Sequence, residues 1–321
     1  MDCRPTHYDT VAGSRASAER GHQCGRQDLL DRAGRGYHDP VTICAPLTDE
    51  QFERARRLAL RLAGIELLDR HRELLERRGV ELVTGPAVDQ WLTRVEGGDA
   101  DASRQLIELL TTNVTAFFRH PWHFDQAAEH ALWTVHRRGP ARLWSAAAAT
   151  GEEPYSLAMS LIDVFRCDDP AVRILATDID ETALAVARDA EYSGTALAAL
   201  VPRHHAQFVG EATASGRRRL ATAVRRLVTF QRLNLAEIAW PIDGTFDVVF
   251  CRNVLLYLDA SHRYAVLERV ASVLEPGGLL LLDPTEHLGG ADLLFVSRGH
   301  GVYSRRAASG SASVLAGSTR R

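Results

Sequence analysis

The sequence predicts an α/β fold in which a doubly wound, mostly parallel sheet follows a small all-helical N-terminal domain. Two patterns support this prediction. In the N-terminal part, apolar residues recur at the three- and four-residue spacing of amphipathic helices. From Ala141 onward, short apolar runs alternate with helical patterns, which is typical of parallel strands joined by crossover helices. With 321 residues and 45% apolar content, the chain can bury one large core or two smaller ones.

Several helices are expected in the N-terminal domain. Thr48 or Asp49 can cap the first, whose apolar positions 52, 55, 59 and 62 lie at helical spacing, and Gly64 can end it. The other expected helices lie around Arg72–Arg78, Val88–Val95 and Ser103–Leu110.

The second part of the chain contains the apolar runs expected of a parallel sheet. The candidate strands are Arg142–Ala146, Arg173–Thr177, Val228–Arg232, Phe246–Cys251 and Leu279–Leu282. Two final runs, Leu294–Val296 and Val302–Ser304, suggest a closing antiparallel hairpin. In such a sheet, ligands bind at the carboxyl ends of the strands, so the residues that follow each strand are the candidate site.

The segment from Glu191 to Leu227 is too long for a simple connection. We predict that Leu220–Val224 forms a strand outside the main sheet. Arginines at 217–219 and 225–226 flank this run and could meet an acidic partner surface. A solvated loop with an edge strand is the alternative interpretation.

Composition excludes several classes of protein. The net charge is −3 and all 38 cationic side chains are arginine, so a basic nucleic-acid-binding surface is not indicated. The five cysteines are odd in number and lack Cys-x-x-Cys spacing, which argues against disulfides or a thiolate zinc site. No apolar run approaches the roughly 20 residues that span a bilayer, and the first residues include charges where a signal peptide is apolar. We therefore expect a soluble, cytoplasmic protein with no direct membrane insertion. Residues 1–46 are expected to be disordered or a non-native extension, and residues 307–321 a flexible tail.

Four segments carry the candidate chemistry. Thr111–Arg119 places small polar side chains, two phenylalanines and a cation within nine residues, which suits an anionic or sulfonium ligand. The other three lie at predicted strands: Trp144–Ser156 spans the turn after the first strand, Ala176–Asp180 ends the second strand, and Phe246–Tyr257 contains the fourth.

In this order, the four segments resemble the CheR-type methyltransferases, which esterify glutamates of bacterial chemoreceptors using S-adenosylmethionine. The resemblance covers roughly Leu47 to Ser304. It implies an N-terminal helical domain over 47–125 and a Rossmann-like methyltransferase domain over 126–306. It also implies a small antiparallel β insertion at about 191–227 that docks onto the receptor.

The resemblance also implies a set of cofactor-binding residues. Glu153 is assigned to the cofactor's ammonium group and Asp178 to both ribose hydroxyls. The residues assigned to the adenine and methionine ends are Asn234, Leu235, Arg252 and Asn253, and those that complete the site from outside the sheet are Asn113, Thr115 and Arg119.

Structural alternatives remain open for the two carboxylates. Glu153 could simply complement the positive end of a helix. Asp178 could be a helix cap, although Asp180 is already placed to cap the helix Glu181–Arg188.

For methyl transfer to a glutamate, the catalytic requirement is positioning. The acceptor carboxylate, with a pKa near 4.3, is already ionised at neutral pH and needs no general base. By resemblance, Arg119 would hold this carboxylate and Tyr257 would present its hydroxyl near the methyl group. The alternatives are a salt bridge between Arg119 and the sheet domain, and a half-buried structural role for Tyr257. We expect no metal, because the histidines (His120, His123, His204 and His205) lack acidic or thiolate ligands at metal spacing.

The chain departs from the family pattern in the acceptor half. The basic helix begun at His71 is interrupted by Gly79 and by Gly85-Pro86, and a Gly-His-Ser-Glu turn is replaced by Asp283-Pro284-Thr285-Glu286. Three hypotheses follow. The first is methylation of glutamates in chemoreceptors or related signalling proteins by a monomer, with S-adenosylhomocysteine as product. The others are methylation of a small-molecule acid or other non-receptor acceptor, and a non-catalytic regulatory module that binds S-adenosylmethionine.

Overall fold

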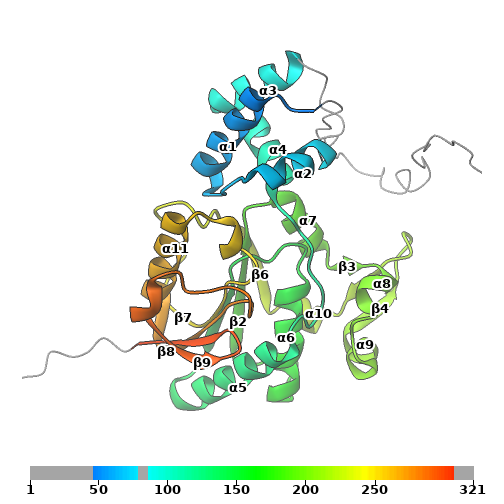
Figure 1. The fold of residues 1–321 in the computed structure, drawn as a ribbon. Helices are drawn as coiled ribbons and strands as arrows, with labels where there is room; N and C mark the ends of the chain where they lie inside the picture. The colour runs from blue at the N-terminus through cyan, green and yellow to red at the C-terminus, as the bar shows by residue number, and fades with distance from the viewer. Residues whose placement is uncertain (1–45, 79–85, 307–321) are drawn as a thin grey trace, which may run out of the picture. The chain divides into compact units, whose positions relative to one another are not determined.

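The computed structural model describes residues 46–78 and 86–306 (Figure 1). The predictions for the N-terminal extension, for Gly79 and Gly85, and for the C-terminal tail fall outside the described residues. Within these residues, no helix combines the length and apolar character needed to cross a bilayer.

The N-terminal helices form as predicted. Helix α1 (Asp49–Ala63) begins at Thr48, whose hydroxyl accepts the Gln51 N–H at 3.2 Å while the Gln51 side chain accepts the Thr48 N–H at 3.0 Å. It ends at Gly64, whose φ of 65° is the left-handed cap conformation. The remaining elements are a 3₁₀ turn η2 (Asp69–His71) and helices α2 (Arg72–Arg78), α3 (Pro86–Glu96) and α4 (Ala100–Leu110).

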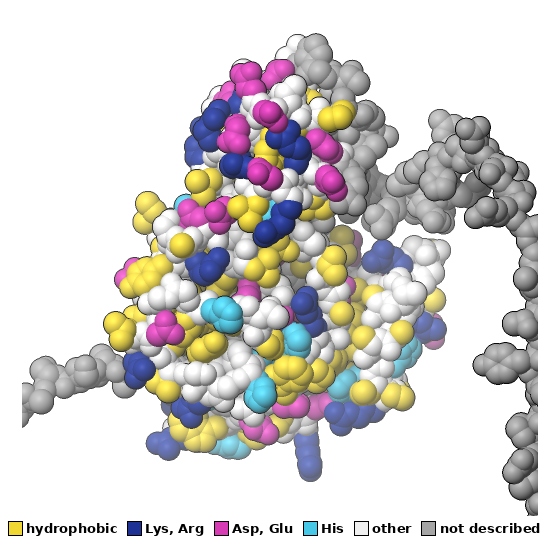
Figure 2. All heavy atoms as spheres, viewed as in Figure 1, with side chains coloured by type: hydrophobic (Ala, Val, Ile, Leu, Met, Phe, Trp, Pro, Cys, Tyr) yellow, Lys and Arg dark blue, Asp and Glu magenta, His cyan; other side chains and the backbone are white. Residues whose placement is uncertain are grey.

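The apolar faces of these helices share one core, which includes Phe52, Trp91 and Leu106. On the surface of this region, cationic and acidic side chains are interspersed (Figure 2). Arg54, for example, forms ion pairs with Asp89 and Glu96, both at 2.8 Å. Mixed charge of this kind gives solubility without a large field of one sign.

The main sheet is doubly wound and mostly parallel, as predicted. Its strand order is β6-β2-β1-β7-β8-β10-β9, and only β10 runs antiparallel to its neighbours. The strands are β1 (Ala141–Ser145), β2 (Val172–Asp178), β6 (Val228–Arg232), β7 (Phe246–Phe250), β8 (Leu274–Leu281), β9 (Phe295–Gly299) and β10 (Val302–Arg305). Strand β8 begins five residues before the predicted start, because its pairing with β7 shifts register and accommodates Pro276-Gly277-Gly278.

Helices cover both faces of this sheet (Figure 1). Helices α5 (Pro121–Arg138) and α6 (Glu152–Phe165) pack on one face and α11 (Ala260–Val273) on the other. Successive residues of β1 show the alternation, since Leu143 lies in the first core and Trp144 in the second. The remaining elements of this part are α7 (Glu181–Asp189) and the 3₁₀ turns η3 (Leu255–Tyr257) and η4 (Ala291–Leu293). Phe117 lies in the first core, Phe118 packs against it, and Cys251 is fully buried.

The insertion forms a second, three-stranded antiparallel sheet in the order β3-β5-β4. Its elements are β3 (Glu191–Tyr192), α8 (Gly194–Leu197), α9 (Pro202–Phe208), β4 (Val209–Ala212), β5 (Arg218–Leu220) and α10 (Thr222–Arg225). The predicted strand at Leu220–Val224 is therefore wrong. The strand ends at Leu220, and the next residues form a short helix that buries Val224.

Three arginines of the insertion bond to backbone carbonyls of the insertion and of the adjoining end of α7. Arg217, Arg218 and Arg219 donate to the carbonyl oxygens of Glu191, Gly210 and Asp189 at 2.7–3.1 Å. These guanidinium groups thus help to close the small sheet.

Candidate functional site

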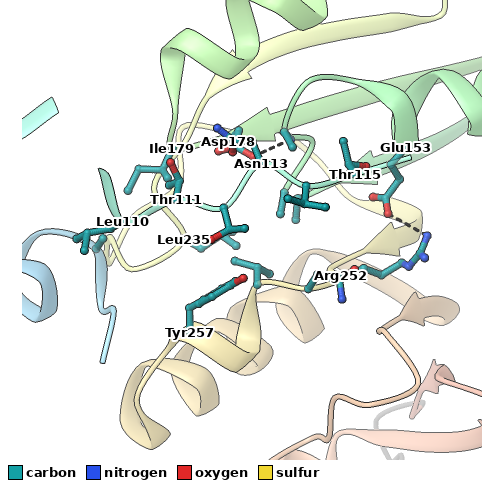
Figure 3. A pocket seen from close by; sticks show the side chains of 18 of the residues that line it. Leu110, Thr111, Asn113, Thr115, Glu153, Asp178, Ile179, Leu235, Arg252 and Tyr257 are labelled. Atoms are coloured by element: carbon teal, nitrogen blue, oxygen red, sulfur yellow. Dashed lines mark hydrogen bonds and ion pairs between the residues drawn. The ribbon is translucent and has the colours of Figure 1, made fainter. Parts of the chain in front are cut away.

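One pocket lies at the carboxyl ends of the parallel strands, as expected for this sheet. Its wall is made by the segment after α4, by the turns after β1, β2, β6 and β7, and by Ala63 and Ile65 at the end of α1 (Figure 3). All of the predicted site residues line this pocket: Asn113, Thr115, Arg119, Glu153, Asp178, Asn234, Leu235, Arg252, Asn253 and Tyr257.

The turn between β1 and α6 brings the backbone close to the pocket. Gly151 has a φ of 98°, and a Cβ there would lie 2.8 Å from the Tyr192 hydroxyl and 2.9 Å from Ala187 Cβ. Tyr192 in turn donates a hydrogen bond to the Thr150 carbonyl at 2.8 Å. Only glycine meets both the conformation and the space.

Glu153 and Arg252 form a buried ion pair beside this turn. Arg252 Nη1 lies 3.0 Å from Glu153 Oε2, and Ser145 Oγ donates to Glu153 Oε1 at 2.8 Å (Figure 3). Burial raises the pKa of Glu153, while the charge of Arg252 and the Ser145 hydrogen bond oppose that shift. Arg252 also donates to the Arg119 carbonyl at 2.6 Å, and its buried Nε has no partner among the described residues. Glu153 therefore does more than complement a helix end.

Asp178 is held by backbone donors at the end of β2. Its two carboxylate oxygens accept the N–H groups of Ala149 at 2.8 Å and Asp180 at 2.9 Å. Burial raises the pKa of Asp178, and these hydrogen bonds oppose the shift. Asp180 caps α7 through the Ala183 N–H at 3.0 Å, as predicted.

Two of the predicted site residues, both asparagines, form side-chain hydrogen bonds within the chain. Asn113 Nδ2 donates to Asp180 Oδ2 at 2.7 Å, and Asn234 Nδ2 donates to the Leu62 carbonyl at 2.7 Å. These bonds attach the Thr111–Arg119 segment and the end of α1 to the strand ends. Leu235 is buried and gives the pocket an apolar wall.

Arg119 and Tyr257 lie at the same pocket. The Arg119 side chain is 38% exposed, and its Nη2 lies 3.4 Å from Asp283 Oδ2. Tyr257 is half-buried in η3, and in Figure 3 its hydroxyl points toward the interior of the pocket. The backbone of Tyr257 is held by the chain after α1, because its carbonyl accepts the Glu66 N–H at 2.8 Å.

The Asp283–Glu286 turn, where the sequence departs from the family pattern, makes contacts that the sequence did not predict. Glu286 is buried, and its carboxylate accepts the N–H groups of Asn253, Leu255 and Asp283 at 2.8–3.0 Å. Asn253 is thereby held at a φ of 58°. One sequence feature could have indicated these contacts: two carboxylates, Asp283 and Glu286, directly follow an apolar strand, a position where acidic groups often face a site.

The histidines are dispersed in the described part of the chain. His204 bonds to Asp163 at 2.7 Å, and His123 Nε2 lies 2.8 Å from the His300 carbonyl. No group of three or more potential metal ligands occurs within residues 46–78 and 86–306.

Comparison with known proteins decides the family. Residues 113–301 match the family model described as "CheR methyltransferase, SAM binding domain". The chain belongs to the CheR methyltransferase family. It is 36% identical to chemotaxis protein methyltransferase 2 of Pseudomonas aeruginosa, over 80% of this chain and 93% of that protein. It is 35% identical to the chemotaxis protein methyltransferase of Escherichia coli, over 88% of this chain and 96% of that protein.

The site fits the cofactor of CheR methyltransferases. S-adenosylmethionine carries an ammonium group, a carboxylate, a ribose diol and an adenine ring. The pocket offers two carboxylates, a buried guanidinium N–H without a partner, and apolar walls. These complementary groups, together with family membership, identify the protein as an S-adenosylmethionine-dependent methyltransferase of chemotaxis.

Proposed function

We propose that this protein transfers a methyl group from S-adenosylmethionine to glutamate side chains in the cytoplasmic region of chemoreceptors. The products would be a glutamyl methyl ester and S-adenosylhomocysteine, and the activity would be cytoplasmic. One observation carries the proposal: a partly exposed guanidinium, that of Arg119, and the Tyr257 hydroxyl lie at the same pocket as the cofactor-type groups. The names of the relatives support a chemotaxis protein as the acceptor.

The proposed cofactor contacts follow the charges of the pocket. Glu153 would accept hydrogen bonds from the ammonium group, and Asp178 would accept them from the ribose hydroxyls. The unpartnered Arg252 Nε suits the carboxylate of the methionine end. Leu235 and Asn234 would border the adenine.

Other residues would contribute by holding the loops of the pocket wall in place. Asn113 and Asn253 are bonded to Asp180 and to Asp283, and these bonds hold the two loops that carry them. Thr115 lies on the same wall as Asn113. These residues would therefore set the shape of the methionine end.

The protein's share of the mechanism is to orient and desolvate the acceptor. When bound, S-adenosylmethionine supplies an electrophilic sulfonium methyl group and leaves as a neutral thioether. Arg119 would hold the acceptor carboxylate through charge-assisted hydrogen bonds and keep one oxygen in line with the methyl carbon. Tyr257 would border the reacting atoms and exclude water. A general base is unnecessary because the carboxylate is already ionised.

The test is an acceptor assay with methyl-labelled S-adenosylmethionine and chemoreceptor-bearing membranes. Label that stays with protein and is released as methanol by alkali supports the proposal. Alkali-stable protein label, or label in small molecules, contradicts it, as does cofactor binding without transfer.

Two arginine variants refine the assay. Arg119→Ala should lose transfer while remaining folded, because the proposed carboxylate ligand is gone. Arg137→Ala is the matched control, since Arg137 is exposed at the far end of α5, where it stacks on Trp133. Equal activity of the two variants would remove the role assigned to Arg119.

A further inference from the structure

One carboxylate oxygen of Asp283 contacts side chains from separate parts of the chain. Its Oδ2 accepts from Asn253 Nδ2 at 2.9 Å and lies 3.2 Å from His120 Nε2 and 3.4 Å from Arg119 Nη2. Its Oδ1 accepts the Thr285 N–H at 3.1 Å and the Thr285 hydroxyl at 2.7 Å. The side chain is only 3% exposed, so these contacts fix its position.

Asp283 remains anionic in this setting. Burial by itself would raise the pKa of Asp283, but hydrogen bonds from Thr285 and Asn253 and the charge of Arg119 hold that pKa well below its usual range. The contact with Arg119 is therefore between full charges. Contacts between charged groups are stronger than those between neutral groups.

The backbone around Arg119 is also constrained. Phe118 and His120, which flank it, have φ values of 53° and 60°, a conformation that is uncommon for residues other than glycine. Arg252 Nη2 donates to the Arg119 carbonyl between them at 2.6 Å. The surrounding structure thus fixes the backbone from which the Arg119 side chain extends. Strained turns of this kind are concentrated at functional sites.

We propose that Asp283 is a positioning residue, which holds one edge of the Arg119 guanidinium so that its other edge is available to an acceptor carboxylate at the pocket. This inference rests on the proposed function of Arg119. Asp283 contacts only Nη2, and 38% of the arginine side chain stays exposed. Because Asp283 is buried and saturated with donors, it lies behind the arginine and does not occupy the acceptor's place.

Loss of Asp283 should weaken acceptor binding more than cofactor binding. When a long side chain is already held in its binding conformation before the ligand arrives, the affinity typically rises by roughly two- to tenfold. We therefore expect Asp283→Ala to raise the KM for the acceptor by about that factor. The Kd for S-adenosylmethionine should change by a smaller factor than the acceptor KM, because Asp283 does not line the cofactor pocket and Asn253, which loses its bond to Asp283, keeps the bond from its N–H to Glu286.

The first experiment measures both constants in matched variants. Acceptor saturation is measured with chemoreceptor-bearing Escherichia coli membranes, and cofactor Kd by calorimetry with S-adenosylmethionine, for Asp283→Ala and Asp283→Asn. The control is Asp247→Asn, a buried carboxylate that bonds Arg138 and the Arg142 N–H at the amino end of β7, on the opposite edge of the sheet. An acceptor KM raised only in the Asp283 variants supports the inference. An unchanged KM, or a cofactor Kd weakened by the same factor, overturns it.

A second measurement does not depend on transfer. The guanidinium NMR signals of Arg119, identified by their loss in Arg119→Lys, should exchange with solvent several-fold faster in Asp283→Ala than in the wild type. Equal exchange rates would show that Asp283 does not hold the arginine. If wild-type protein forms no alkali-labile methyl ester, the proposed function fails, while this measurement still decides whether Asp283 orders Arg119.

Discussion

Removal of the Arg252 guanidinium is the sharpest test of the site's electrostatics. Arg252→Met would keep a long apolar side chain but leave Glu153, now 3.0 Å from Arg252 Nη1, without its cation. The Arg252 side chain is 1% exposed and that of Glu153 is 11% exposed, so water can replace little of the lost interaction. Two unit charges about 4 Å apart interact by roughly 4 kcal/mol at an effective dielectric constant of about 20. Breaking one side of a buried pair typically costs about 3–5 kcal/mol.

We therefore expect Arg252→Met to lose about 4 kcal/mol of unfolding free energy at pH 7. The loss should shrink at lower pH. Burial already raises the pKa of Glu153, and removal of the neighbouring cation raises it further. A group whose folded-state pKa is raised destabilises the fold as the pH rises through that pKa, so protonation of Glu153 at lower pH restores stability.

The assay is urea denaturation of the wild type, Arg252→Met, Glu153→Gln and the double variant, at pH 7 and pH 5. If the unpaired carboxylate causes the loss, the double variant should be clearly more stable at pH 7 than Arg252→Met alone. A double variant as unstable as Arg252→Met would refute this reasoning. So would an Arg252→Met protein with wild-type stability.

Three further outcomes are expected. Because burial raises the pKa of both Glu153 and Asp178, lowering the pH should begin to weaken the affinity for S-adenosylmethionine, measured by calorimetry, before the pH reaches about 4.3, the ordinary pKa of glutamate; an affinity that stays constant down to that pH would contradict the assignment. Gly64→Ala should cost about 1–2 kcal/mol in urea denaturation, since φ is 65° and a Cβ would lie 2.8 Å from His262 Cδ2; an equally stable variant would show that the turn can relax. Thr48→Ala should cost about 1 kcal/mol in the same assay through loss of the α1 cap, and no loss would mean that another group replaces it.

Much of the fold followed from local sequence patterns. Thr48 and Gly64 bound α1 because their side-chain and backbone preferences suit the two ends of a helix. Short apolar runs located the strands, with β8 the clearest error in length, since its first residues include a proline and two glycines. The run from Leu220 was misassigned because alternating small and apolar residues fit a strand or a single helical turn equally well.

The candidate site was predictable where residues follow strand ends. Glu153, Asp178 and Arg252 share a pocket because parallel strands bring their carboxyl ends to one edge. Which of these groups bond to one another was not predictable, since sequence position does not specify side-chain direction. The pairing of Glu153 with Arg252 spans 99 positions and depends on β1 and β7 being neighbours.

The sequence by itself determined the positions of the strands of the main sheet, the ends of α1 and the identity of the polar groups at the sheet edge, because these depend on short-range preferences and on hydrophobic periodicity. Only the tertiary structure decided that Asp283 meets Arg119, which lies 164 positions away. That contact requires the turn after β8 to lie beside the strained turn before α5. The physical reason is that contacts between distant segments depend on packing geometry, which no local pattern specifies.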